Sequence, residues 1–206
     1  MIEIKTVKSE KELKDLFNVL SEIFYDDAVE NDEHYYTMSE RYEEMKEQYK
    51  KNKDFLMYVE KDNQIVAGLT GKGMDLEKKK ITIGILAVKK EYRMNGLAKR
   101  LVEEFEKRCK KNKIEHIDLG ARFRACEFYK SLNYKYSLMV QVFDFVTIDD
   151  VRRFNKFDLE EGFSWQGETY GFIFFKVDCI DKKFIEYFEK NVKTAHVQYI
   201  FEKDII

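Results

Sequence analysis

The stretch that most constrains the fold runs from Ile81 to Leu101. An apolar, β-branched run, ITIGILAV, leads into a short polar turn, and the turn opens into a helix with apolar residues four positions apart. Gly96 and Ala98 in this turn allow the backbone to approach a ligand closely. A helix begins with unpaired backbone N–H groups and the positive end of its dipole. The pattern therefore predicts a phosphate-binding site, here called the phosphate seat, with the cation of Arg93 at its edge.

A second strand and helix follow, with the sequences IEHIDLG and ARFRACEFYKSLNYK. Together the two pairs resemble the GNAT acyltransferases, which carry a Gln/Arg-x-x-Gly-x-Gly/Ala turn and a later Ala-x-x-Phe-Tyr-x-x-x-Gly-Phe/Tyr helix. Here these motifs are Arg93 to Ala98 and Ala125 to Tyr134. Asn133 stands at the usual glycine, and asparagine tolerates the left-handed conformation that a helix end needs. The resemblance implies an α/β (α+β mixed sheet) acyl-CoA N-acyltransferase fold.

The segments before the turn also predict defined elements. Ser9 and Glu12 form a capping-box pattern at the start of an amphipathic helix that is expected to end near Tyr25. A second helix is expected to run to about Tyr49. Two strands then form a hairpin around Asp62-Asn63, a dipeptide suited to a tight turn. This order of elements is also the order of the family that the chain resembles.

The chain has 206 residues, of which 44% are hydrophobic, enough for one sizeable domain with an appendage. We predict a GNAT domain over residues 1–148 and a C-terminal strand-helix-strand extension, residues 149–206, packed on it. Residues 158–168 are expected to be an irregular connector that holds the only tryptophan, Trp165. The apolar strands of the extension must be paired or covered. They either complete the sheet of their own chain or pair with a second copy, so a homodimer is an open alternative.

Composition excludes several other classes of protein. The formal net charge of −2 argues against nucleic acid as the main partner. No stretch has the length of a membrane span, and the N-terminus lacks the apolar core of a signal peptide, so no membrane association and a cytoplasmic location are expected. Three cysteines without Cys-x-x-Cys spacing indicate reduced thiols.

The resemblance implies acetyl-CoA as the co-substrate and no metal. The pyrophosphate of coenzyme A would lie on backbone N–H groups of residues 95–99, and its pantetheine arm along residues 86–88. Lys89, Lys90, Lys99 and Arg100 are candidate cations for the adenosine 3′-phosphate, and Arg122 stands where many relatives have a CoA-contacting asparagine. The expected cofactor-binding residues are Leu86, Ala87, Val88, Arg93, Met94, Asn95, Gly96, Leu97, Ala98 and Lys99.

Tyr129 matches the family tyrosine that often protonates the departing CoA thiolate. A phenol with an ordinary pKa of about 10 stays protonated at neutral pH, so this role is chemically reasonable, although a packed core tyrosine is an equal alternative. Cys126 lacks a visible activating base and is interpreted as a packed residue.

The acceptor amine must lose a proton before it attacks, and the strand ITIGILAV contains no acid for that task. Water or a carboxylate from Asp26, Asp27 or Glu30 is expected to accept this proton, with His34 a weaker candidate. The acidic, aromatic stretch 25–36 falls where the family has its acceptor-binding loop and suits a cationic amine. A solvated charged loop is the alternative. The expected acceptor-binding residues are Tyr25, Asp26, Asp27, Tyr35 and Tyr36.

These observations predict an N-acetyltransferase that transfers acetyl from acetyl-CoA directly to a primary amine of a small molecule or peptide. The alternative is a CoA-binding regulatory or scaffold protein that has the fold without the transfer activity.

Overall fold

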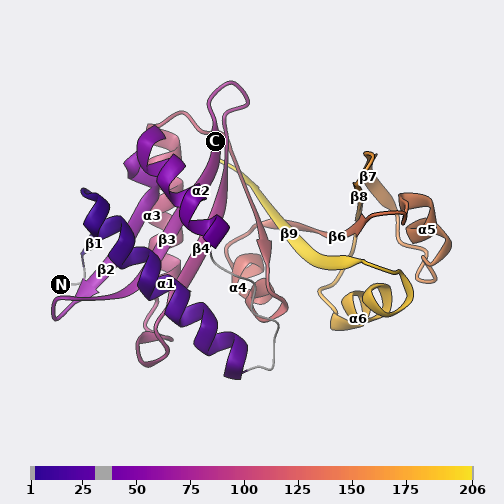
Figure 1. The fold of residues 1–206 in the computed structure, drawn as a ribbon, viewed down its shortest axis with the longest axis horizontal. Coiled ribbons are helices and arrows are strands. Elements are labelled where there is room, and N and C mark those ends of the chain that lie inside the picture. Colours follow the sequence, from indigo (N-terminus) through magenta and orange to yellow (C-terminus); the bar gives the residue numbers. More distant parts are fainter. Residues whose placement is uncertain (1–2, 31–38, 206) are drawn as a thin grey trace. The chain divides into compact units, whose positions relative to one another are not determined.

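The computed structural model describes residues 3–30 and 39–205 (Figure 1). Contacts within the chain divide it into a first unit, residues 1–117 with 204–206, and a second unit, residues 118–203. The described residues form nine β-strands and six α-helices, which confirms the α/β class. No helix among them has the length and apolar character needed to cross a membrane. The predicted domain boundary after residue 148 stays a prediction.

The first unit contains an antiparallel sheet in the order β1-β2-β3-β4. Asp62 and Asn63 connect β2 to β3 with positive φ angles of 51° and 60°, as the dipeptide predicts for a tight hairpin turn. The elements of this unit are β1 (Ile4–Thr6), α1 (Glu10–Glu30), α2 (Ser39–Lys51), β2 (Leu56–Lys61), β3 (Gln64–Asp75), β4 (Lys80–Val88) and α3 (Leu97–Lys111).

A β-bulge at Gly84 divides β4 into two halves that face different layers. Thr70 of β3 pairs with Ile85 and Gly71 pairs with Ile83, so Gly84 has no partner in the register. Beyond the bulge, Ile85 belongs to the core cluster under α1. Before it, Ile81 lies against Gly71 together with Phe105 of α3. The bulge therefore lets one strand serve the cores on both faces of the sheet.

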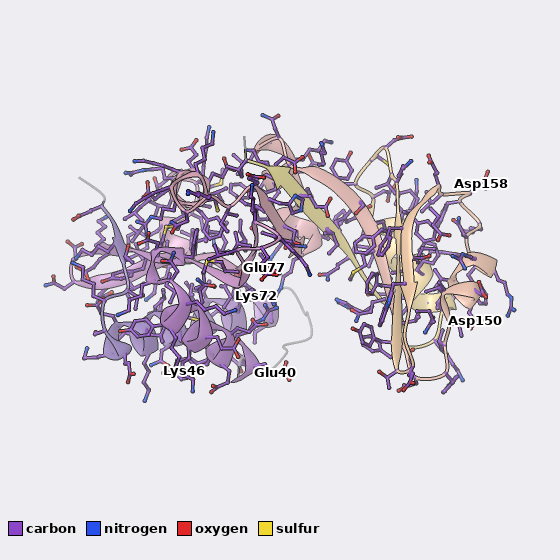
Figure 2. All side chains as sticks on the ribbon, turned by 90° about the horizontal axis from the view of Figure 1, so that it is seen from above. Glu40, Lys46, Lys72, Glu77, Asp150 and Asp158 are labelled. Carbon is purple, nitrogen blue, oxygen red and sulfur yellow. The ribbon has the colours of Figure 1, made fainter. Side chains whose placement is uncertain are left out.

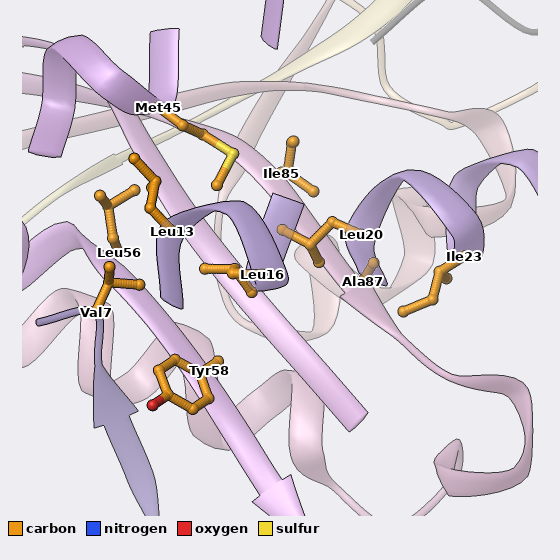
Figure 3. Close-up of a cluster of buried hydrophobic side chains, with 10 residues drawn as sticks. All are labelled: Val7, Leu13, Leu16, Leu20, Ile23, Met45, Leu56, Tyr58, Ile85 and Ala87. Carbon is orange, nitrogen blue, oxygen red and sulfur yellow. The ribbon is translucent and has the colours of Figure 1, made fainter. Parts of the chain in front are cut away.

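The core cluster between α1 and the sheet fixes the position of α1. Figure 3 shows Leu13, Leu16, Leu20 and Ile23 of α1 directed toward strand residues that include Tyr58. The approach is close because Gly68 of β3 has no side chain: a Cβ there would lie 2.6 Å from Leu16 Cδ1. Burying such aliphatic side chains contributes about 1.5–3 kcal/mol each. Residues along α1 from Leu13 to Ile23 thus hold the helix against the sheet.

Helix α1 does not end near Tyr25, as the sequence indicated, but continues to Glu30. Its start is as expected, because Ser9 Oγ accepts a hydrogen bond from the Glu12 N–H at 3.2 Å. The apolar spacing continues through Ile23 to Ala28, and both residues are buried. The first part of the expected acceptor loop is therefore helical, whereas Tyr35 and Tyr36 lie outside the described residues.

The second unit has strands in the order β5-β9-β6-β8-β7, and the first two residues of β5 belong to the first unit. Strands β8 and β9 pair antiparallel with β6 on its two sides, so the apolar strands of the extension complete a sheet of their own chain. Helix α5 begins with a capping box between Thr147 and Asp150, which is labelled in Figure 2. The elements are β5 (His116–Ala121), α4 (Cys126–Ser131), β6 (Lys135–Phe143), α5 (Ile148–Arg153), β7 (Glu161–Gln166), β8 (Tyr170–Phe175), α6 (Lys182–Asn191) and β9 (His196–Asp204).

The segment expected to be an irregular connector contains the strand β7, so that expectation was wrong. In the β7–β8 register Phe163 lies opposite Phe174, and Trp165 lies opposite Phe172. The Trp165 and Phe172 rings stack with their centroids 5.5 Å apart. Such cross-strand aromatic pairs stabilise a hairpin and outweigh the weak strand propensity of the glycines and acidic residues around them.

A substitution at Gly68 tests the packing that positions α1. Gly68→Ala places a methyl group against Leu16 and Leu20, and overpacking of this kind is expected to cost about 1–3 kcal/mol of stability. Gly162→Ala is the control, because the nearest atom to its added Cβ would be 3.5 Å away. Thermal unfolding followed by circular dichroism measures both. Equal melting temperatures for the two variants would contradict the proposed tight contact.

Candidate functional site

The turn between β4 and α3 has an open, left-handed backbone. Met94 and Gly96 have φ angles of 60° and 72°. A Cβ placed on Gly96 would meet no atom within 4 Å, so the space beside this residue is open. Met94 is fully exposed and gains nothing from packing. Met94 is one of nine described non-glycine residues with positive φ, a conformation that is uncommon for a residue of this size.

The start of α3 leaves its first N–H groups available for an anion. Gly96 is the N-cap and supplies no side-chain cap, and the first helical turn contains no acidic residue. The Arg100 N–H donates to the Gly96 carbonyl at 3.1 Å, which is the first hydrogen bond of the helical pattern. The N–H groups in the first turn of α3 point out of the start of the helix, at the positive end of its dipole. This arrangement fits a phosphate group, as the sequence predicts.

Arg93 is held by two protein acceptors. Its Nε donates to the Val88 carbonyl at 2.9 Å, and its Nη2 donates to Asp27 Oδ1 at 2.7 Å. Val88 is the last residue of β4, and Asp27 lies in the last turn of α1. The guanidinium therefore joins the turn to two elements of the first unit. Its expected role as a cation at the rim of the phosphate seat stays a prediction.

A pocket of about 150 Å³ lies beside this ion pair. It brings together residues that the sequence assigned to two different sites, because Asp26 and Asp27 are expected to bind the acceptor and Lys89 and Lys90 the 3′-phosphate. Tyr25 is largely exposed. The residues that line the pocket are Glu22, Ile23, Asp26, Asp27, Lys89, Lys90, Glu91 and Arg93.

The three expected pantetheine-binding residues differ in burial. Ala87 is buried in the core cluster with α1, whereas Leu86 and Val88 are half-buried. On one side their backbone pairs with Leu69, Gly68 and Ala67 of β3. In an antiparallel pair, the N–H and C=O groups of alternate residues point away from the partner strand. On its other side β4 has β5 as the neighbouring strand, so the pantetheine-binding role of residues 86–88 stays a prediction.

Tyr129 in α4 of the second unit is almost completely buried, with 5% of its surface exposed. Its ring packs against Phe128 at 5.0 Å and Phe201 at 5.5 Å between centroids. Burial raises the pKa of its phenol above the ordinary value, so the hydroxyl keeps its proton at neutral pH. No hydrogen bond from this hydroxyl is found among the described residues. The side chain is therefore a rigid, protonated donor, and its catalytic role stays a prediction.

Two neighbours of Tyr129 match their interpretation from the sequence. Cys126 is buried, and burial raises the pKa of its thiol to about 12, so little nucleophilic thiolate forms at neutral pH. Asn133 has a φ angle of 61°, and the Tyr134 N–H donates to the Tyr129 carbonyl at 3.2 Å. Asparagine thus ends α4 as the glycine of the family motif would.

Sequence reasoning missed the contact between Asp27 and Arg93. The signal that could have found it is the apolar spacing of α1, which continues through Ile23 and Ala28 without glycine or proline. A longer helix would have placed Asp27 on the same side as Ile23, one turn further on.

An open left-handed turn between a strand and an uncapped helix, on a mixed α/β fold, is the arrangement of proteins that bind a phosphate group at a helix start. The model of the acetyltransferase (GNAT) family matches residues 13–134. The chain belongs to this family, as its sequence motifs indicated. No curated protein matches the chain.

Solved structures share the fold at low sequence identity. The ribosomal-protein-S18-alanine N-acetyltransferase from Escherichia coli is 13% identical, with a TM-score of 0.53 over 100% of this chain and 94% of that chain. An acetyltransferase of the GNAT family from Staphylococcus aureus Mu50 is 15% identical, with a TM-score of 0.54 over 85% and 100% of the two chains. N-acetylglutamate synthase from Neisseria gonorrhoeae, complexed with coenzyme A and N-acetyl-glutamate, is 11% identical, with a TM-score of 0.50 over 100% of this chain and 35% of that chain.

Thiol labelling tests the environment assigned to Cys126. Cys109 and Cys126 are buried with pKa values raised to about 12, whereas Cys179 is exposed. We expect a disulfide reagent at neutral pH to modify Cys179 quickly and the other two thiols only after unfolding. The count of released chromophore in buffer and in denaturant measures this. Fast native labelling that survives Cys179→Ser would show an accessible, reactive Cys126 or Cys109.

Proposed function

We propose that the protein is an N-acetyltransferase that moves the acetyl group of acetyl-CoA directly to a primary amine in a ternary complex. The observation that carries the proposal is the open, uncapped start of α3 at Gly96, within a chain of the GNAT family. The N. gonorrhoeae relative, whose structure contains coenzyme A, supports the same co-substrate.

Residues of the first unit would hold the co-substrate, whose thioester supplies an activated acetyl group. The N–H groups of residues 95–99 would bind the pyrophosphate, since they lie at the positive end of α3. Residues 86–88 would align the pantetheine arm through main-chain hydrogen bonds. Among the candidate cations, Lys99 is 60% exposed and lies a loose 3.9 Å from Glu103, so it can turn toward a 3′-phosphate.

Tyr129 would act as the general acid that protonates the departing thiolate. Burial raises the pKa of its phenol, which keeps the proton on the hydroxyl at neutral pH and also makes the phenol a weaker acid than an exposed tyrosine. The amine acceptor must be neutral, and the carboxylate of Asp26 or an ordered water would remove its proton. Asp26 is exposed and lines the pocket beside the turn. A backbone N–H of β4 would stabilise the charge that develops on the thioester oxygen.

A CoA-binding regulatory protein without transfer activity is the second candidate. The observation that favours it is the absence of any carboxylate in β4, KITIGILAV, where relatives often carry the base. Thiol release from acetyl-CoA in a panel of primary amines separates the two functions. Amine-dependent release supports the enzyme, and CoA binding without release for every amine supports the regulatory protein.

Substitution of Gly96 tests the phosphate seat. At 100 times its Kd, CoA stabilises the folded chain by about 2.7 kcal/mol, which raises the melting temperature by roughly 5–10 °C. Gly96→Glu places bulk and negative charge at the anion site, so this shift should disappear. Gly73→Glu is a matched control, because Gly73 also has positive φ and no atom within 4 Å of an added Cβ. A folded Gly96→Glu protein that CoA still stabilises would place the seat elsewhere.

Substitution of Tyr129 tests the general acid. Tyr129→Phe removes the proton donor and keeps the ring, so kcat should fall by roughly 10²–10⁴-fold while the Kd for CoA changes little. Tyr134→Phe is the control, since Tyr134 is also buried and its ring lies 5.8 Å from that of Tyr129. Steady-state kinetics with an active amine measure both variants. An unchanged kcat would assign Tyr129 to the core alone.

A further inference from the structure

We propose that Asp27 is a positioning residue for the co-substrate turn. Through Arg93 it holds residues 89–96 in the shape that presents the first N–H groups of α3. This inference rests on the proposed function, because the turn is taken to bind the pyrophosphate of coenzyme A. It assigns Asp27 to the co-substrate side of the site, whereas its sequence position indicated the acceptor side.

The ion pair depends on the extended α1. Ile23 and Ala28 are buried, so the C-terminal part of α1 packs against the protein. Asp27, between them in the sequence, contacts Arg93 of the β4–α3 turn. The Asp27 side chain is only 16% exposed, and Oδ1 accepts from Arg93 Nη2 at 2.7 Å. For comparison, the exposed pair Lys99–Glu103 lies 3.9 Å apart. The Asp27–Arg93 pair is thus shorter and better shielded from solvent than a surface pair.

Arg93 connects Asp27 to the whole turn. Its Nε also donates to the Val88 carbonyl at 2.9 Å, so one planar guanidinium bridges α1 and the end of β4. The Arg93 N–H donates to the Lys90 carbonyl at 3.2 Å. Asn95 Nδ2 then donates to the Arg93 carbonyl at 3.1 Å. These bonds form a continuous path from α1 to the residue before Gly96.

The turn needs this support because its backbone is strained. Met94 has positive φ, and its fully exposed side chain makes no packing contribution. Such conformations persist only where neighbouring contacts fix them. Arg93 and Asn95, on either side of Met94, are the residues that carry those contacts.

The position of Asp27 is unfavourable for the helix itself. An acidic residue near a helix C-terminus opposes the dipole, and the last turn of α1 contains no basic residue. Helix stability therefore does not account for a carboxylate at this position. The 2.7 Å hydrogen bond from Arg93 gives this carboxylate a partner from another part of the fold.

Truncation of the carboxylate tests the inference. Asp27→Ala should weaken CoA binding about five- to thirtyfold by calorimetry, since the turn must then be ordered on binding. Glu22→Ala is the matched control: it removes a carboxylate from the same helix and pocket, and no contact of its side chain is found among the described residues. Its effect should be less than twofold. Asp27→Asn should restore part of the loss, because it keeps an acceptor oxygen.

Hydrogen exchange gives a readout that needs no ligand. In the free protein, amides of residues 93–99 should exchange faster in Asp27→Ala than in the wild type or Glu22→Ala. Arg93→Lys keeps the charge but loses the planar guanidinium, so amides of residues 93–99 should also exchange faster in this variant. It replaces Asp27→Ala in the test if Asp27→Ala does not fold. Asp27→Ala, Arg93→Gln and the double variant form a cycle. The losses of CoA affinity in the two single variants should not add in the double variant.

The outcomes separate this inference from the proposed function. If the wild type binds CoA and Asp27→Ala matches Glu22→Ala in affinity and exchange, the positioning role is overturned. If the wild type does not bind CoA, the proposed function fails, and the exchange rates still decide whether Asp27 orders the turn. Additive effects in the double variant would also contradict a path through Arg93.

Discussion

The guanidinium of Arg93 is the contact on which the first unit's candidate site depends. It joins three places in the chain: the last turn of α1, the end of β4 and the turn that opens α3. The backbone hydrogen bonds of the sheet do not connect α1 to the turn, whereas Arg93 does. Helix α3 is held against the sheet by its own buried residues, such as Phe105 beside Gly71, and Arg93 adds a link from α1 to the turn that precedes α3. In the proposed function, the N–H groups at the start of α3 would form a binding site whose shape exists before a ligand arrives, which would reduce the entropy lost on binding.

The core of the first unit makes that contact geometrically available. Gly68 lets Leu16 and Leu20 of α1 lie close against β3, and the packed N-terminal turns set the direction of the helix. Ile23 and Ala28 continue this packing toward the last turn of α1, where Asp27 contacts Arg93. The bulge at Gly84 acts on β4, the other element that Arg93 contacts. It lets side chains of β4 pack on both faces of the sheet, and the strand continues to Val88, where the turn begins.

Local chemistry made much of this structure predictable from the sequence. The Asp62-Asn63 hairpin, the left-handed Asn133 and the strand–turn–helix at Gly96 each follow from the conformations that single residues tolerate. The length of α1 was underestimated because acidic residues weaken a helix C-terminus and the arginine that pairs with Asp27 is far away in the sequence, although the apolar spacing through Ile23 and Ala28 indicated a longer helix. Strand β7 was missed for a similar reason: its strand state depends on aromatic partners in β8.

The two halves of the proposed reaction place different demands on the sequence. A pyrophosphate seat made from backbone N–H groups needs left-handed φ angles, an uncapped helix start and an open space beside Gly96, and very different sequences can meet these conditions. Structures that share 11–15% of their residues with this chain share its fold. Recognition of an amine depends instead on charged and aromatic side chains, which change without altering the fold. Because backbone conformation and side-chain recognition are separate requirements, the motifs around Gly96 and Asn133 identify the family. In the proposed reaction, side chains elsewhere would select the amine acceptor.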